Sequence, residues 1–380
     1  MSRKRVIYQS EALFVGSTGT SSNTAVQIHR VQSANYSFDV ARTDINQFGQ
    51  LARIDSLIIE QPTVALDFTY YPNSGSEENL MGFKVGGNGT NNAQMVAYML
   101  DGTKDVYNYY IVTSTEGIDT NLDADSSDAS SVIGLGNMSI TSYSTDGAVG
   151  DFVSTTINAE GLNMVIDSSG MTAVSDNLVP SNPAVTVDDG NSVGGTVLIP
   201  PAAGNVHDTA SNPIDNIISA LQPKDVSVGL TALGGATIGI DATDLKLQSF
   251  SLGVDLGRTP LEKLGSRFAF SREIDFPVTA TLDFSANLGD MGANSDVGNS
   301  SLESIVEDDS ADYDIAVCVK PTVGHGLHWV LMGAKLDSQS FSSSIGDNKS
   351  VDMSFSTQIG GPADTDHGLS IAVQTAACSL

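Results

Sequence analysis

Apolar and polar residues alternate with a period of two over several stretches of this chain, which is the pattern of half-buried β-strands. The clearest stretch is 63–70, where every second residue is apolar: Val64, Leu66, Phe68 and Tyr70. A matching stretch at 278–284 carries Val278, Ala280, Leu282 and Phe284. Candidates for helices are few and short, at 77–81, 214–221 and 301–307. The pattern therefore predicts a mainly β protein with few short helices.

An internal repeat accounts for the matching stretches. Segment 32–68 aligns without gaps to segment 248–284, so that every position has its counterpart at one constant offset. Eleven of the 37 aligned positions are identical, whereas ordinary residue usage gives roughly one chance match in fifteen. Apolar character also persists where identity does not, as at Phe38 and Val254. We therefore expect two tandem copies of one packed domain.

The flanks of this segment extend the repeat when small gaps are allowed. In the gapped alignment, two pairs of later strands correspond: Met138 and Ile140 with Ala334 and Leu336, then Val153 and Ile157 with Val351 and Phe355. The pattern predicts a first repeat at 1–162 and a second at 224–380, with a C-terminal extension from about 361. Segment 163–223, rich in Gly, Pro, Asp and Ser, is expected to be a connector.

Composition and charge narrow the class of function. The chain carries 45 Asp and Glu against 17 Lys and Arg, a formal net charge of -28. Such a surface repels nucleic acid, which argues against groove binding or phosphate neutralisation. No Lys or Arg occurs from 105 to 223, while seven of the 17 basic residues lie in two repeat-equivalent windows, 30–53 and 258–272. We expect these windows at domain or subunit interfaces.

Two further features concern the location of the protein. The basic segment 1–5 is not followed by an apolar signal-peptide core, and no apolar run reaches membrane-spanning length. A large chain without a secretion signal rarely relies on a single bridge, so Cys318 and Cys378 are expected to be free thiols. The missing signal-peptide core argues against a secreted protein, and no membrane partner is expected.

Three kinds of motif in the chain resemble catalytic or metal-binding sites but lack the sequence context that such sites need. Gly190–Gly194 matches the nucleophile-elbow pattern around Ser192, but the required strand and helix do not flank it. His325 and His328 lie among glycines, which argues against a helix that presents both to a metal ion. The acidic clusters at 123–128 and 307–309 lack the glycine and distal glutamate of a calcium loop. We predict no catalytic, cofactor or metal site.

The residues shared by the two repeats are the candidates for assembly. Each repeat places a carboxylate three residues before a guanidinium, as Asp39 and Arg42 and again as Asp255 and Arg258. Such an arginine either binds a carboxylate of a neighbouring subunit bidentately or forms a salt bridge within its own domain. The glycines are expected in turns with positive φ. The full candidate set is Asp39, Arg42, Thr43, Gly49, Asp255, Arg258, Thr259 and Gly265.

Two sequences within the repeats carry a family resemblance. SFDVARTDINQFGQLARID followed by PTVALDFTYY, and FSLGVDLGRTPLEKLGSRFAFSREIDFPVTATLDF in the second repeat, resemble the tail tube (major tail) proteins of tailed bacteriophages. The resemblance covers both repeats and leaves the connector unexplained. It implies two tail-tube-like β-barrel or sandwich domains, whose strands join those of neighbouring subunits into one barrel around a channel.

The resemblance further implies a non-enzymatic virion protein, made in the host cytoplasm and located in the tail. Because two domains are fused, a six-fold ring closes as a trimer. The expected partners are further copies of the chain, other tail proteins at the tube ends, and phage DNA that transits an acidic channel without specific binding. No cofactor is implied. Alternatives are a head decoration or tail terminator protein and a secreted surface-layer or adhesive β protein, and the acidity has solubility as its alternative explanation.

Overall fold

The structure is a computed structural model of the chain, and most of both repeats is described in it. The described residues are 7, 11–17, 25–59, 62–87, 94–114, 116, 129–167, 171–174, 177–180, 220–232, 245–264, 269, 271–288, 312–321, 325–343 and 348–374. Strands dominate these residues and the helices are short, so the mainly β prediction is confirmed. None of the helices among them is long and apolar enough to cross a membrane.

The first repeat and the connector contain thirteen described strands and two short helices. The strands are β1 (Glu11–Ser17), β2 (Val26–Gln27), β3 (Val31–Asp39), β4 (Arg42–Ile45), β5 (Asp55–Ile58), β6 (Thr63–Tyr70), β7 (Val85–Gly86), β8 (Tyr107–Ser114), β9 (Ala129–Ala148), β10 (Ser154–Gly161), β11 (Asn163–Asp167), β12 (Met171–Val174) and β13 (Asn177–Pro180). The helices are α1 (Ser76–Leu80) and α2 (Ala97–Leu100). Helix α1 confirms the helix expected at 77–81.

The second repeat begins after a 3₁₀ turn, η3 (Pro223–Asp225), and contains nine described strands. They are β14 (Val226–Ala232), β15 (Leu245–Asp255), β16 (Arg258–Leu261), β17 (Ser271–Ile274), β18 (Thr279–Leu288), β19 (Tyr313–Val319), β20 (Gly326–Ser342), β21 (Ser350–Gln358) and β22 (Gly368–Gln374). The helix expected at 301–307 and most of the one expected at 214–221 lie outside the described residues.

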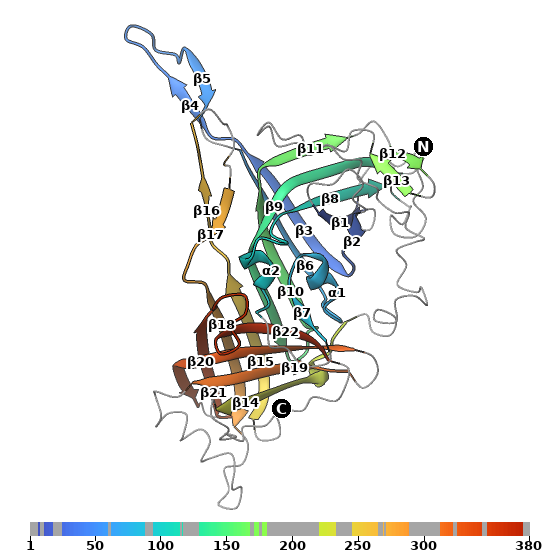
Figure 1. Cartoon of the computed structure of the whole chain (residues 1–380), viewed down its shortest axis with the longest axis vertical. Coiled ribbons are helices and arrows are strands. Elements are labelled where there is room, and N and C mark those ends of the chain that lie inside the picture. Colours follow the sequence, from blue (N-terminus) through green and yellow to red (C-terminus); the bar gives the residue numbers. More distant parts are fainter. Residues whose placement is uncertain are drawn as a thin grey trace, which may run out of the picture.

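One sheet runs through both repeats (Figure 1). Its central strands follow the order β20-β21-β18-β15-β9-β10-β6-β3, with four strands from each repeat. Strands β9 and β20 are long, and their N-terminal halves join a second layer in which β9 pairs with β8 and β11, and β20 pairs with β19 and β22. Each repeat is therefore a small β-sandwich, and the two sandwiches share their central sheet.

The strand registers of the two repeats agree residue by residue. Ser33 lies opposite Thr69 between β3 and β6, and Ser249 lies opposite Ser285 between β15 and β18, so both partners are displaced by the offset found in the sequence. A register shift occurs between residues 31 and 33 in the first repeat and between residues 247 and 249 in the second. The constant offset between the two repeats in the sequence therefore links residues whose backbone positions are equivalent in the structure.

The long strands β9 and β20 bend at equivalent positions. At each bend, a backbone N–H donates a hydrogen bond to an equivalent side chain. Asn137 in β9 and Gly333 in β20 both have positive φ, at 51° and 60°. The Asn137 backbone N–H donates to Asn108 Oδ1 over 2.9 Å, and the Gly333 backbone N–H donates to Asp314 Oδ1 over 3.0 Å. Because glycine and asparagine tolerate positive φ better than other residues, each repeat carries a residue suited to this bend.

The gapped part of the sequence alignment needs a correction. Ile157 lies opposite Phe68, and Met353 lies opposite Phe284, which is the equivalent of Phe68. Ile157 therefore corresponds to Met353, whereas the sequence pattern aligned it with Phe355. In the same way, Thr155 rather than Val153 corresponds to Val351. A slip of two residues keeps every side chain on the same face of a strand, so period-two patterns cannot detect it.

The alignment of Met138 and Ile140 with Ala334 and Leu336 agrees with the register, and one further strand pair follows from it. The same alignment makes Gly136 equivalent to Met332. Asn163 of β11 lies opposite Gly136, and Gly368 of β22 lies opposite Met332. Strands β11 and β22 are thus equivalent strands of the two sandwiches. The expected boundaries at 162 and 361 place these strands in the connector and in the C-terminal extension.

A single large hydrophobic core extends through both repeats. It includes Phe68, Tyr109 and Tyr143 from the first repeat and Trp329 and Phe355 from the second, all nearly inaccessible to solvent. Trp329 Nε1 donates a hydrogen bond to the Tyr143 hydroxyl over 3.2 Å. Because indole and phenol groups need partners when buried, this bond fixes the two repeats at a defined relative position.

The expectation of free thiols is wrong for Cys318, which is disulfide-bonded. No free cysteine occurs in the described part of the chain, and Cys378, the other cysteine, lies outside it. Cellular compartment and chain length do not predict this bond, because they carry no information about the fold. In the structure, β19 and the last described strand, β22, flank the same strand, β20.

A carboxyl group is buried in the core of the first repeat, at the start of α1. Glu78 is fully buried, its Oε1 accepts a hydrogen bond from the Tyr70 hydroxyl over 2.7 Å, and its Oε2 has no hydrogen-bond partner. Burial raises the pKa of Glu78 to about 7, and the neighbouring Glu77 carboxyl adds to the rise. Arg30 forms an ion pair with Glu77 beside it.

This carboxyl predicts a pH-dependent contribution to stability. Because the pKa of Glu78 is higher in the folded chain than its ordinary value of 4.5, its contribution is fully present below about 4.5 and is lost as the pH rises through about 7. Glu78→Gln is therefore expected to gain stability relative to the wild type between about pH 5 and about pH 8. Urea denaturation at both pH values measures the difference, and a difference independent of pH would contradict the assignment.

Candidate assembly interface

The two repeats are joined edge to edge by β9 and β15, and we call this contact the internal junction. Seven residue pairs run antiparallel from Ser249 opposite Ala148 to Asp255 opposite Ser142. Beyond them, the Val149 N–H donates to the Gln248 carbonyl over 2.9 Å and the Leu256 N–H donates to the Thr141 carbonyl over 2.7 Å. The junction is thus a continuous antiparallel ladder and not merely a contact of side chains.

Side chains on the core side of the internal junction are buried. Leu252 and Val254 of β15 are 1% and 3% exposed, and the facing Thr145 and Tyr143 of β9 are 0% and 1% exposed. The Tyr143 hydroxyl accepts a hydrogen bond from Thr145 Oγ1 over 2.9 Å. The junction therefore combines main-chain pairing with a sealed apolar side, as a permanent interface requires.

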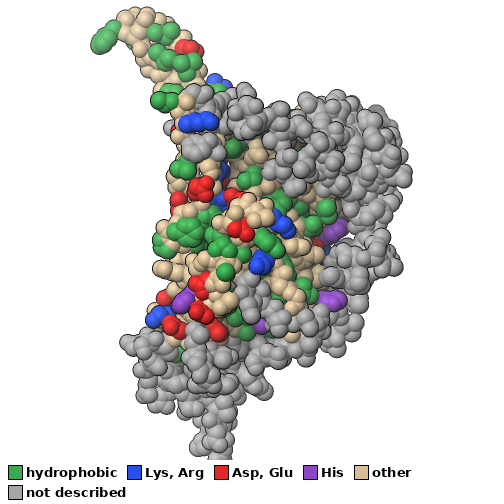
Figure 2. Space-filling view, viewed as in Figure 1, with side chains coloured by type: hydrophobic (Ala, Val, Ile, Leu, Met, Phe, Trp, Pro, Cys, Tyr) green, Lys and Arg blue, Asp and Glu red, His purple; other side chains and the backbone are tan. Residues whose placement is uncertain are grey.

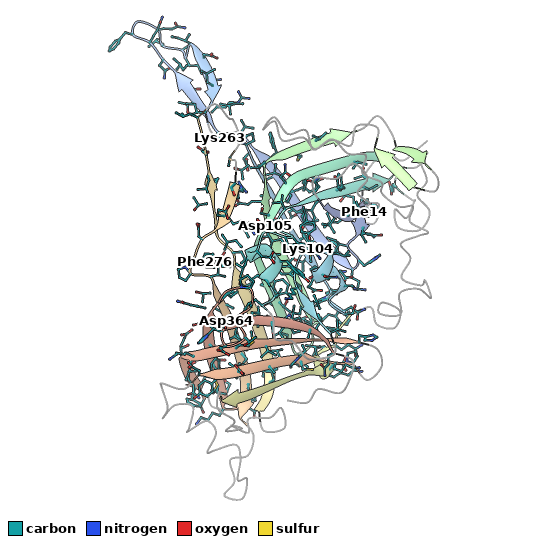
Figure 3. The ribbon with its side chains drawn as sticks, viewed as in Figure 1. Phe14, Lys104, Asp105, Lys263, Phe276 and Asp364 are labelled. Atoms are coloured by element: carbon teal, nitrogen blue, oxygen red, sulfur yellow. The ribbon has the colours of Figure 1, made fainter. Side chains whose placement is uncertain are left out.

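An arginine anchors the second repeat on the first. Arg258 binds the Asp105 carboxylate bidentately, with 2.9 Å from Nη1 to Oδ2 and 2.5 Å from Nη2 to Oδ1. Its Nε donates to the Ile140 carbonyl over 3.1 Å, and its side chain is only 1% exposed. Asp105 lies beside β16 and β17 at the face of the first repeat (Figure 3). Both alternatives expected for Arg258, a neighbouring subunit or its own domain, need a correction, because its bidentate partner Asp105 belongs to the other repeat of the same chain.

The hairpin formed by β16 and β17, which we call the second arm, follows this anchor along the first repeat (Figure 1). Arg272 of this arm lies 3.4 Å from the Glu160 carboxylate, measured from Nη1 to Oε2. Burial lowers the pKa of Arg272, and Glu160 opposes that shift. Of the two basic windows in the sequence, the second therefore supplies Arg258 and Arg272 to the contact between repeats.

Two sheet edges, one in each repeat, have no partner among the described residues. Strand β3 pairs only with β6, and the C-terminal half of β20, 335–342, pairs only with β21. On their core side these edges carry Phe38 and Phe341, which are 41% and 51% exposed. The equivalents of these residues at the internal junction, Val254 and Thr145, are buried. The two free edges therefore resemble the two strands of the internal junction without their pairing.

A second hairpin, formed by β4 and β5, projects away from the sandwiches (Figure 1), and we call it the first arm. Its pairing of Arg42 with Ile58 repeats the pairing of Arg258 with Ile274 in the second arm. Hydrophobic side chains are exposed along it (Figure 2), and they are Ile45, Phe48, Leu51, Ile54, Leu57 and Ile59. A large apolar surface on a projecting hairpin is typical of a docking element.

The remaining assembly candidates have the following positions. Asp39 and Asp255 are exposed at the ends of β3 and β15, and Arg42 and Thr43 are exposed in β4. Thr259 Oγ1 donates to the Asp275 carboxylate over 2.8 Å. Gly49 lies at the tip of the first arm with a φ of 86°, which confirms the expected turn, and Gly265 lies outside the described residues. The aspartates thus do not pair with the arginine of their own repeat among the described contacts.

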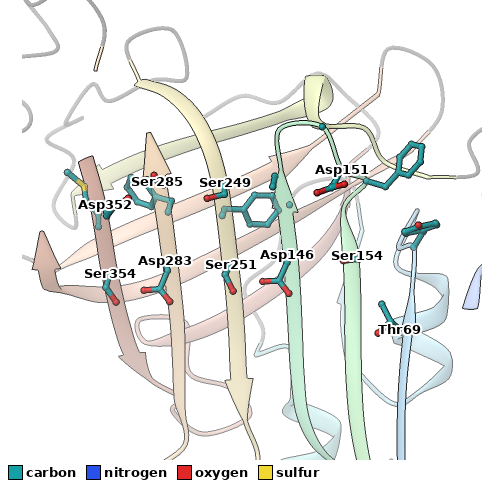
Figure 4. Close-up of a pocket in the computed structure, with 18 of the residues that line it drawn as sticks. Thr69, Asp146, Asp151, Ser154, Ser249, Ser251, Asp283, Ser285, Asp352 and Ser354 are labelled. Atoms are coloured by element: carbon teal, nitrogen blue, oxygen red, sulfur yellow. The ribbon is translucent and has the colours of Figure 1, made fainter. Parts of the chain in front are cut away.

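The polar face of the central sheet is hollowed. A hollow of about 840 Å³ extends over strands of both repeats and is lined mainly by Ser, Thr and Asp side chains (Figure 4). Four of its lining residues are aspartates, and none is Lys or Arg: the aspartates are Asp146, Asp151, Asp283 and Asp352. Lys335 of β20, opposite Ser356, stands outside this lining. The hollow therefore presents negative charge without a basic counterpart.

The motifs with catalytic or metal-binding potential have the following positions. Ser192 and the acidic clusters 123–128 and 307–309 lie outside the described residues. His328 is part of β20, with His325 just before that strand. Within the described ranges, no group of three His, Cys, Asp or Glu side chains is placed to hold a metal ion.

No protein-family model matches the chain, and no curated protein matches it. Among solved structures, it is similar to the tail of an empty gene transfer agent particle refined with C6 symmetry, at 14% identity and a TM-score of 0.27, over 37% of this chain and 96% of the other. It is also similar to the SPP1 tail tube, at 16% identity and a TM-score of 0.26, over 37% and 76%. An Hcp protein matches at 10% identity and a TM-score of 0.20, over 38% and 96%.

Proposed function

We propose that this chain is a structural subunit of a phage tail tube, which closes into a ring by repeating its internal junction between subunits. The observation that carries the proposal is the pair of free edges, β3 and the C-terminal half of β20, which are the equivalents of β15 and β9. In the outer seam, as we call the contact between subunits, β3 of one subunit pairs with β20 of the next. By the register of the internal junction, Ser37 then lies opposite Ser340 and Phe38 opposite Gln339.

A head-to-tail contact of this kind forms a ring if its rotation closes and a filament if it does not. The tail-tube resemblance of the sequence supplies six domains per ring, and two domains per chain then give three subunits. Closure would bury Phe38 and Phe341, and it would pair the main-chain groups of two open edges. Open edges of this length promote aggregation unless they are covered, which supports a covered state as the functional one.

The polar face of the central sheet lines the channel in this proposal. Its four aspartates repel DNA phosphates, so the genome passes without the counterion release that strengthens binding. Stacked rings then form the tube, with other tail proteins at its ends, and the assembled protein belongs to the virion. The first arm, with its exposed apolar side chains, is the element that reaches the adjacent subunit.

Electron microscopy of the purified chain, combined with mass measurement of isolated rings, tests this function. We expect rings of three chains with six similar lobes, a channel lined by the central sheet, and stacking into tubes. A head decoration or tail terminator role predicts rings or monomers that do not stack. Rings of six chains, or a channel lined by positive charge, would contradict the proposal.

A further inference from the structure

Arg42 has the same place in the first repeat as Arg258 in the second, but its surroundings differ. Arg258 is buried against the other repeat, while Arg42 is exposed and forms no ion pair within the described residues. The arms that carry the two residues share one register. Arg42 therefore occupies the equivalent anchor position but is not docked within the described part of its own chain.

The equivalent docking position lies on the second repeat. Ile140, whose carbonyl accepts a hydrogen bond from Arg258, corresponds to Leu336, because both lie at the same register shift between their long strand and the next. The carbonyl of Leu336 is thus the expected main-chain acceptor for Arg42. This residue lies at the start of the free edge of β20.

A carboxylate is also present at this position. Tyr107 and Tyr313 are equivalent by register, so the position of Asp105 corresponds to residue 311, next to Asp312. Asp312 Oδ1 is buried without a hydrogen-bond partner, and it lies 3.5 Å from Nζ of Lys335, the residue preceding Leu336. The Lys335 side chain is 59% exposed, so this contact is a weak surface pair.

We propose that Arg42 of one subunit binds the Asp312 carboxylate and the Leu336 carbonyl of the next subunit, in place of the contact between Asp312 and Lys335. The proposal rests on the proposed function, since it assigns the charged anchor of the outer seam. The planar guanidinium of an arginine binds a carboxylate bidentately and has a further N–H for a carbonyl, whereas a lysine ammonium acts as a point charge without this fixed planar geometry. Docking also brings the first arm onto the second repeat of the neighbour.

The test measures the chain concentration at which rings form, by mass photometry, together with the thermal midpoint of the free chain. Arg42→Ala and Asp312→Asn are each expected to raise that concentration about tenfold or more, because each leaves one partner of the pair without its counterpart. The double variant is expected to be no worse than either single one. The thermal midpoint of the free chain is expected to stay unchanged.

Matched controls come from the same arm and the same edge. Arg53→Ala removes an exposed pair with Asp44 that is internal to the arm, and Asp337→Asn removes a neighbouring exposed carboxylate. Both variants are expected to assemble as the wild type does.

A charge reversal gives a second test. Arg42→Asp alone is expected to block assembly, and adding Asp312→Arg to it is expected to restore assembly. If Arg42→Ala assembles normally while the wild type forms rings, this inference is wrong and the proposed function stands. If the wild type forms no rings, the proposed function itself fails.

Discussion

Phe38→Pro is expected to yield a folded chain that no longer forms rings. Across the internal junction the Leu256 N–H donates to β9, and main-chain N–H groups alternate between the two sides of a strand, so the N–H of Val254 also points toward β9. Phe38 is the equivalent of Val254, and its N–H therefore points out of the free edge of β3. Proline removes that donor from the outer seam and leaves the pairing of β3 with β6 in place. Circular dichroism and mass photometry measure the fold and the assembly.

The matched control is the same substitution at the equivalent position of the second repeat. Val254 is 3% exposed, and its N–H belongs to the internal junction, so Val254→Pro is expected to lose about 3 kcal/mol or more of folding free energy. The two variants thus separate assembly from folding at equivalent positions. Assembly of Phe38→Pro at the wild-type concentration would show that β3 is not an edge of the outer seam.

Arg258→Ala is expected to destabilise the chain by about 3 kcal/mol, the lower end of the range for breaking a buried pair from one side. The substitution removes a guanidinium with a 1% exposed side chain, together with its bonds to the Ile140 carbonyl and to both oxygens of Asp105. Asp105 is 22% exposed, so water compensates part of the loss. Urea denaturation followed by far-ultraviolet circular dichroism measures the change.

Arg53→Ala is the control for this prediction, because its pair with Asp44 lies on the first arm with side chains 60% and 45% exposed. Exposed pairs of this kind contribute about 0–1 kcal/mol. A loss of stability in Arg258→Ala no larger than that in Arg53→Ala would mean that the second arm does not hold the two repeats together.

The sequence predicted much of the fold because duplication and strand periodicity are both local signals. Period-two patterns predicted β6 and β18, and the constant offset between the repeats placed Phe38 of β3 and Val254 of β15 at equivalent positions. The slip at Ile157 arose where the alignment needed gaps, since a shift of two residues preserves the facing of every side chain. Strands β11 and β22 lay beyond the aligned segments and were therefore assigned to the connector and to the C-terminal extension.

The candidate interface was predictable only in part. The shared position of Arg42 and Arg258 marked an arginine with a special role, but Asp105 lies 153 residues from Arg258, outside the aligned segment. The position of Asp105 corresponds to residue 311 of the second repeat, whereas the carboxylate lies at Asp312. Sequence identity between the repeats therefore could not identify this pair. The partner strand of β15 was also hidden, because edge pairing depends on main-chain groups that every residue carries.

A disulfide crosslink between Ser37→Cys and Ser340→Cys tests the outer seam most directly. These residues correspond to Gly253 and Ser144 of the internal junction, a pair without direct main-chain hydrogen bonds, for which Cα atoms lie about 4.5 Å apart and suit a disulfide. Gly253→Cys with Ser144→Cys is the internal positive control, and Ser37→Cys with Ser342→Cys is the out-of-register control. Under oxidation, we expect covalent species that end at three chains. Absence of the crosslink in assembled protein, or a ladder that continues to six chains, would contradict this expectation.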